Sequence, residues 1–157
     1  MAHEAARGDR DTYIWFDYHK LLDWDMCWRK ARNAEGDRIT EDGLCMSMYK
    51  AIKYGCSCSA YIKNMVEPGW SIKAGSGYDL NSIMHYPSRS GHATQQCADD
   101  GENCPLYAYV DSNNHGEGVY EVVQARKPSE ADIMWVKRNY PWKKKTWGIT
   151  ARFEGSR

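Results

Sequence analysis

The chain has 157 residues, the length of one domain, and could bury roughly two-thirds of the surface that its unfolded form exposes. Its 21 basic and 21 acidic side chains cancel, so charge favours neither nucleic acid nor an anionic membrane as a partner. No apolar run approaches the roughly 20 residues of a membrane helix, which excludes a membrane span. We therefore expect one soluble domain with no nucleic-acid role.

The first predicted elements are a strand and a helix. Residues 13–18, YIWFDY, are aromatic and strand-like. Residues 20–32, KLLDWDMCWRKAR, are predicted to form a helix that ends before Gly36.

A second helix is expected to begin at Thr40, where Glu41 and Asp42 complement the exposed amides of a first turn. Its apolar positions recur at helical spacing: Leu44, Met48 and Ile52. Gly55 supplies the stop.

The middle of the chain is predicted to be irregular. We expect a helical turn over residues 59–66, irregular chain over 70–91, and an exposed, disulfide-tied loop region over 93–118.

The last predicted helix has the clearest start. Ser129 is an N-cap residue with Asp132 at the third position, a capping box. An apolar stripe of Ile133, Val136 and Tyr140 follows, and Pro141 ends the helix. Residues 143–157 form a basic tail, most simply a solvated one.

The cysteines indicate disulfides and secretion. There are six, an even number without a CxxC pair: Cys27, Cys45, Cys56, Cys58, Cys97 and Cys104. One pairing is singled out, Cys97 with Cys104 across a short polar loop, and the others stay open. The Cys56-Ser57-Cys58 pair could suit a soft metal, but no further ligands stand at suitable spacing. Residues 1–30 hold no apolar run for a signal peptide, so we expect a mature chain or one whose front is missing.

Three segments carry a family resemblance. HEAARGDRDTY at residues 3–13 and YDLNSIMHYPS at residues 78–88 resemble two signature segments of the astacin family of zinc metalloendopeptidases. PSEADIMWVKRNYPW, residues 128–142, is similar to the helix that closes their catalytic domain. The segments stand in the family's order and span nearly the whole chain.

The resemblance implies an α+β fold, the C-terminal half of a metzincin domain over residues 1–142, with short helices, irregular loops, little sheet and disulfides. It implies a secreted enzyme that cleaves protein or peptide substrates with one zinc ion.

The resemblance also assigns site residues. In HExxHxxGxxH three histidines bind zinc, and His3 is similar to the third. Met84 resembles the methionine of the Met-turn, the floor beneath the metal. Tyr86 resembles a catalytic tyrosine that lies on the resting zinc and then hydrogen-bonds the oxyanion. Glu4 resembles a supporting glutamate that pairs with the mature amino terminus.

The rest of that zinc motif would stand before Met1. It would supply two imidazoles and the general base that activates water, so we expect this chain alone to be inactive and unable to hold zinc. The remaining histidines offer no substitute HxxxH pair and are expected to be surface or hydrogen-bonding residues: His19, His85, His92 and His115.

Arg7, Asp9, Arg10 and Asp11 suit a charge-paired turn or, equally, an ordinary solvated one. An alternative function stays open for the whole chain, a non-catalytic secreted binding module derived from such a peptidase. Its 7 Trp and 11 Tyr would then either line a partner surface or fill a loop-rich core. A third possibility is an unrelated cysteine-rich domain.

Overall fold

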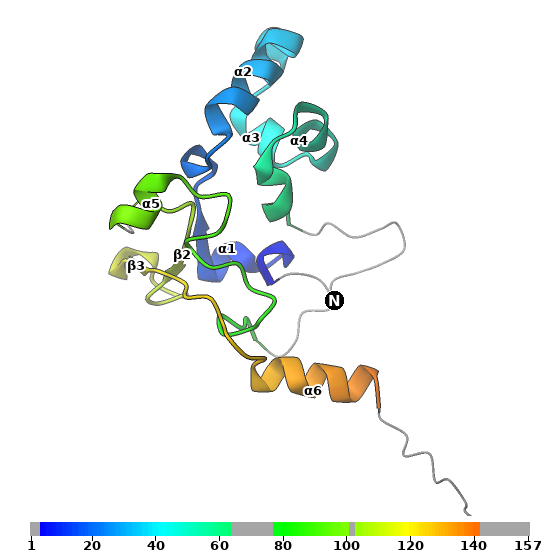
Figure 1. The fold of residues 1–157 in the computed structure, drawn as a ribbon, viewed down its shortest axis with the longest axis vertical. Helices are drawn as coiled ribbons and strands as arrows, with labels where there is room; N and C mark the ends of the chain where they lie inside the picture. The colour runs from blue at the N-terminus through cyan, green and yellow to red at the C-terminus, as the bar shows by residue number, and fades with distance from the viewer. Residues whose placement is uncertain (1–3, 64–76, 101–102, 142–157) are drawn as a thin grey trace, which may run out of the picture.

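The computed structural model describes residues 4–63, 77–100 and 103–141, in which short helices surround a small sheet (Figure 1). The helices are α1 (Arg10–Tyr13), α2 (Trp24–Glu35), α3 (Glu41–Cys45), α4 (Met48–Tyr54), α5 (Gln95–Asp100) and α6 (Glu130–Asn139). The strands are β1 (Ile14–Phe16), β2 (Leu106–Tyr109) and β3 (Val119–Tyr120). The 3₁₀ turns within the same described ranges are η1 (Glu4–Ala6), η2 (Tyr18–Lys20), η3 (Gly36–Arg38), η4 (Ser57–Tyr61) and η5 (His115–Glu117). The expected α+β class with little sheet is confirmed, and the tail at 143–157 lies outside the described residues.

The sheet is antiparallel in the order β1-β2-β3. Trp15 pairs with Tyr107, and Ala108 pairs with both Ile14 and Tyr120. Because β2 is central, Leu106, Tyr107 and Ala108 are buried. The expected exposed, disulfide-tied loop region over 93–118 is therefore wrong at α5 and β2, because the polar residues around LYAYV concealed a buried strand. The disulfide is present, and residues 110–118 are largely exposed.

The first predicted helix forms, but later than expected. Residues 18–20 make the 3₁₀ turn η2, in which the His19 amide donates to the Asp17 carboxylate, so α2 begins at Trp24. It ends at Glu35, and Gly36 takes a positive φ of 61° as its stop. The strand-like run at 13–18 shortens to β1.

The second predicted helix is two helices. Thr40 caps α3 by accepting a hydrogen bond from the Gly43 amide, and Ser47 caps α4 in the same way from Lys50. The break between them shifts the helical phase, so Leu44 is fully buried whereas Ile52 is 64% exposed. The single apolar stripe expected from the sequence is thus wrong at Ile52.

Residues 24–61 form what we call the disulfide lobe, in which α2, α3 and α4 pack together away from the sheet (Figure 1). Cys27 pairs with Cys56, and Cys45 with Cys58. Both disulfides lie in the main core with the buried side chains of the lobe: Trp24, Ala31, Ile39, Leu44, Ala51, Tyr54 and Tyr61.

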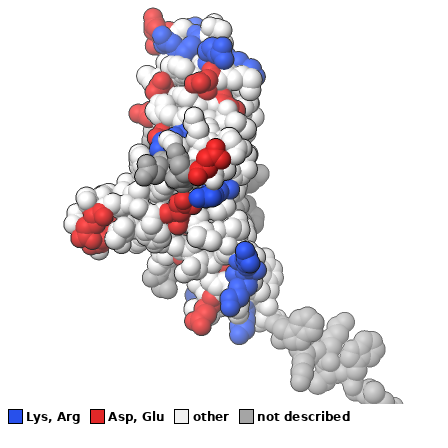
Figure 2. Space-filling view, turned by 60° about the vertical axis from the view of Figure 1, so that its left-hand side comes forward, with Lys and Arg blue, Asp and Glu red and all other residues white. Residues whose placement is uncertain are grey.

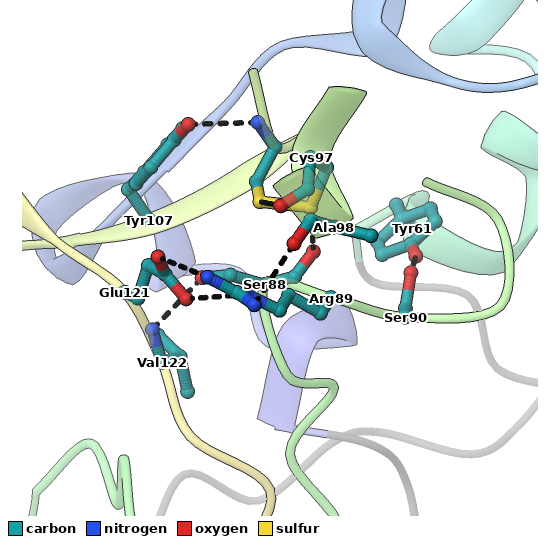
Figure 3. Close-up of a disulfide and its surroundings, with 10 residues drawn as sticks. Tyr61, Ser88, Arg89, Ser90, Cys97, Ala98, Tyr107, Glu121 and Val122 are labelled. Atoms are coloured by element: carbon teal, nitrogen blue, oxygen red, sulfur yellow. Dashed lines mark hydrogen bonds and ion pairs between the residues drawn. A yellow bond between two sulfur atoms is a disulfide. The ribbon is translucent and has the colours of Figure 1, made fainter. Parts of the chain in front are cut away.

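The third disulfide joins Cys97 of α5 to Cys104 before β2, the pairing expected from the sequence (Figure 3). The Cys104 amide donates to the Tyr107 hydroxyl at 2.7 Å. Nearby, Arg89 forms a two-point ion pair with Glu121 and donates to the Ala98 carbonyl. These bonds fix the chain that leaves the YDLNSIMHYPS segment.

Helix α6 contrasts with the lobe. The predicted capping box is present, with the Ser129 hydroxyl and the Asp132 carboxylate each accepting the other's amide at 3.0 Å. The stripe expected to pack is exposed in the described residues, to 43% at Ile133 and 46% at Val136. The helix leaves the rest of the molecule after its first turn (Figure 1), so most of its length meets no described core. None of the helices in the described ranges combines the length and apolarity needed to cross a bilayer.

Candidate functional site

The YDLNSIMHYPS segment forms a tight, hydrogen-bonded turn. The Ser82 amide donates to the Asp79 carbonyl at 3.2 Å, and the His85 amide donates to the Ser82 carbonyl at 3.0 Å. The Ser82 hydroxyl also accepts the Met84 amide at 3.1 Å. Ser82 is 1% exposed, so its bonds form where water competes little. The hydrogen bonds of Ser82 therefore fix the backbone conformation at Met84.

Asp132 of α6 holds this turn from outside. One carboxylate oxygen accepts the Ser82 hydroxyl at 2.7 Å, and the other accepts the Ile83 amide at 2.9 Å. That second oxygen also accepts the Ser129 amide of the capping box. The Ser129 hydroxyl donates to the Asp79 side chain. One carboxylate thus joins the start of α6 to the turn.

Hydrogen bonding also lowers the pKa of Asp132. Burial alone would raise the pKa, but donation from Ser82, Ile83 and Ser129 more than offsets burial and keeps the carboxylate charged. Sequence reasoning identified Asp132 as a helix cap and missed its contact with the turn. No spacing signal points to that contact, because Ser82 and Asp132 stand 50 residues apart.

The segment bearing the candidate ligand His3 meets the same turn. His3 lies outside the described residues, but the amide of the next residue, Glu4, donates to the Met84 carbonyl at 3.2 Å. The structure thus brings Glu4, at the start of the described residues, together with Met84, near the middle of the chain. Burial raises the pKa of Glu4, and the ion pair with Arg7 at 3.1 Å opposes that rise.

The polar run after Glu4 is a charge-paired turn, as one reading of the sequence expected. Arg7 is 5% exposed and makes a two-point pair with Asp9 at 2.9 and 2.7 Å. It also donates to the Gly77 carbonyl at 2.6 Å and lies over the Tyr78 ring. These contacts attach the start of the YDLNSIMHYPS segment to η1. Burial raises the pKa of Tyr78, and the negative charge of Glu4 adds to that rise.

Arg10 is the second buried arginine. It pairs with Asp11 at 2.8 Å and donates to the carbonyls of Ala5 and Tyr61. It therefore joins η1 to the end of the disulfide lobe.

Tyr86 packs against the same buried tyrosine. Its ring centroid lies 5.1 Å from that of Tyr61, which is 1% exposed and shares a 2.7 Å hydrogen bond with Ser90 (Figure 3). Tyr86 itself is partly buried. Tyr61 was not identified from the sequence, because nothing in its spacing distinguishes it from the other aromatic residues. Its ring packs against one side of the Tyr86 ring.

The four other histidines have separate partners, as expected of hydrogen-bonding residues. His85 is 3% exposed and contacts the Tyr86 carbonyl at 2.7 Å and the Tyr78 hydroxyl at 3.0 Å. His19 lies between two carboxylates, His92 meets the Tyr61 ring edge-on, and His115 stacks on Tyr109. No group of three or more metal-binding side chains occurs within the described parts of the chain.

On the face that Figure 2 shows, acidic and basic side chains both occur, interspersed with uncharged surface. This agrees with the zero net charge.

Comparisons of the chain with protein-family models, with curated proteins and with solved structures found no match. The structure shows an α+β, disulfide-rich fold.

Proposed function

We propose that the chain is the C-terminal part of the catalytic domain of a secreted, astacin-like zinc metalloendopeptidase. The observation that carries the proposal is the hydrogen bond from the Glu4 amide to the Met84 carbonyl. It joins two segments that resemble the zinc motif and the Met-turn, as a shared metal site would require. The three disulfides support export to an oxidising compartment.

The donors available suit zinc but are too few. An imidazole at His3 and a phenol at Tyr86 are nitrogen and oxygen ligands of the kind that zinc accepts. A catalytic zinc usually has three protein ligands and an open position for water. The proposal therefore requires two further histidines and a glutamate, encoded before Met1. Bound zinc would supply an activated water at neutral pH.

The residues of this chain would then have distinct roles. The Tyr86 hydroxyl offers a lone pair to a cation and a proton to a developing oxyanion. Met84 presents an apolar thioether in a turn whose backbone is fixed by Ser82 and Asp132. Tyr61 limits the movement of the Tyr86 ring on one side. Glu4, which pairs with Arg7 here, would also pair with the mature amino terminus.

The first test is the transcript sequence upstream of Met1. An open frame that encodes HExxHxxG directly before Met1 is the expected result. A stop codon in that frame, or an unrelated sequence, would remove the proposal.

The second test uses the protein with that upstream segment. We expect one zinc per chain by mass spectrometry of the metal and cleavage of a quenched peptide. Tyr86→Phe should lower kcat by about 10²- to 10³-fold with the zinc content kept. The matched control is Tyr140→Phe, since Tyr140 is 70% exposed on α6, and it should cleave normally. Equal activity of the two variants would contradict the role of Tyr86.

A second candidate function is a non-catalytic secreted binding module. It is favoured by the disulfides, because two of them lie in the main core and the third in a second buried cluster, as in a small disulfide-stapled domain. The transcript decides between the two candidates, because the module requires no zinc motif.

A further inference from the structure

Strand β1 is an edge strand of the sheet that the described residues form. It is the first strand in the order β1-β2-β3, so β2 pairs with only one side of it. The Asp17 amide donates to the Pro105 carbonyl at 2.8 Å, which continues the register that pairs Trp15 with Tyr107. In an antiparallel ladder alternate residues bond the same neighbour. The backbone groups of Ile14 and Phe16 therefore point away from β2.

Of these edge groups, only the Ile14 amide has a backbone partner among the described residues. The Ile14 amide donates to the Arg10 carbonyl. Among the described residues, the Phe16 amide donates no hydrogen bond and the carbonyls of Ile14 and Phe16 accept none. Ile14 is only 1% exposed, so the edge groups within reach of a ligand are those of the half-buried Phe16. An edge of this kind is a template for a further strand.

A cleft of about 460 Å³ follows this edge. Residues 14–16 all line it, although successive side chains of a strand point to opposite faces. A cleft that runs along the edge of the strand explains why all three residues line it, because side chains on either face of the strand can reach its edge. Met46, just after α3, also lines the cleft, and Tyr61 contributes from η4.

The walls favour an apolar occupant. Trp15 is 40% and Met46 71% exposed, so apolar surface is available to a ligand. The charged groups of the cleft are already paired. Asp42 accepts the Tyr18 hydroxyl at 2.6 Å, and Asp11 pairs with Lys63 and Arg10.

We propose that this cleft binds an extended peptide segment, which adds to β1 as a fourth strand and places an apolar or aromatic side chain beside Met46. Main-chain hydrogen bonds to Phe16 would give affinity, and the cleft would select the side chain. The site needs neither zinc nor His3, so it does not rest on the proposed function.

The test is an NMR titration of the ¹⁵N-labelled full chain with a blocked pentapeptide of sequence threonine-valine-tyrosine-valine-threonine. The Phe16 amide should exchange rapidly with solvent in the free chain and about tenfold more slowly in the complex. Alternate amides of an extended peptide point to opposite edges of the peptide, and only one of these edges would face β1. Two N-methylated forms of the peptide, methylated on alternate sets of amides, therefore each remove the hydrogen-bond donors of one edge. One form should bind about tenfold more weakly than the parent, and the other should bind within about twofold of it.

Met46→Lys should weaken binding about tenfold by removing apolar surface from the wall. The matched control, Met26→Lys, changes a 51% exposed methionine of α2 outside the cleft and should bind normally. Both side chains are exposed, so both variants should fold.

Several results would overturn the proposal. They are no binding at about 1 mM peptide, equal binding of the two methylated forms, and equal loss in the two lysine variants. Slow exchange of the Phe16 amide in the free chain would show that another part of this chain covers the edge. A dimer in sedimentation that Met46→Lys dissociates would assign the edge to a second copy.

Discussion

The disulfide lobe and helix α6 are both helical, but different interactions hold them. The lobe buries its apolar side chains around two disulfides, and Leu44 and Ala51 are fully buried. Helix α6 exposes the apolar stripe that the sequence predicts and is attached through the polar groups of its first turn, Asp132 above all. The comparison separates two questions that an amphipathic pattern combines: where a helix starts, and what its apolar face meets.

The largest effect is expected from opening the lobe. Cys27→Ala with Cys56→Ala removes a link across a sequence separation of 29 residues and should lower the free energy of unfolding by about 3 to 4 kcal/mol in urea denaturation. The matched control is Cys97→Ala with Cys104→Ala, a separation of only 7 residues. Chain entropy predicts a loss smaller by about 1 kcal/mol for the control. Equal losses would contradict this loop-length account.

The next effect tests the packing of the lobe. Leu44→Ala should cost about 3 kcal/mol, because it leaves a cavity beside the disulfides. Ile52→Ala, at the same helical spacing in the sequence, should cost less than about 0.5 kcal/mol, since Ile52 is 64% exposed. Thermal and urea unfolding of both variants measure the difference. Similar losses would mean that α3 and α4 form one continuous helix after all.

A smaller effect is expected from detaching α6. Asp132→Ala removes the hydrogen bonds from Ser82 and Ile83 and one half of the capping box, and should cost about 2 kcal/mol. Exchange of the Ile83 amide should accelerate more than that of amides in β2. The matched control is Glu130→Ala, one residue into the same helix, with an expected cost under about 0.5 kcal/mol. Unchanged Ile83 exchange would rule out the clamp.

The same carboxylate should make stability depend on pH. The pKa of Asp132 in the folded chain lies below its usual 3.8, because donated hydrogen bonds outweigh burial. Its contribution is then complete above about pH 5 and is lost as the pH falls through the folded-state pKa. Between about pH 5 and pH 2 the parent chain should lose more stability than Asp132→Asn, which cannot titrate. Parallel losses would assign the acid sensitivity to other carboxylates, such as Asp9.

Local chemistry made the helix ends predictable. Thr40, Gly55 and the Ser129–Asp132 capping box act within a few residues of themselves, and each is where the sequence placed it. The Cys97–Cys104 pair is local in the same sense.

Partners distant in the chain decided what the sequence could not show. Burial of β2 depends on strands on both sides of it, and exposure of Ile52 depends on a break at Ser47 that the apolar spacing conceals. Within the candidate site, Met84 and Tyr86 stand in one recognisable segment, whereas the contact between Ser82 and Asp132 requires the folded chain.

The smallest effect gives the sharpest test of how α6 is held. Ile133→Lys with Val136→Lys places two charges on the stripe that the sequence predicted to be buried. If the polar clamp alone holds the helix, the free energy of unfolding should change by less than about 0.5 kcal/mol. A loss above about 2 kcal/mol would show that a surface outside the described residues covers this stripe. In this chain such a surface would have to belong to residues outside the described ranges 4–63, 77–100 and 103–141. A segment encoded before Met1 would give a different result: the substitution would be neutral in this chain and costly in the extended protein, and the clamp would then be only part of the attachment.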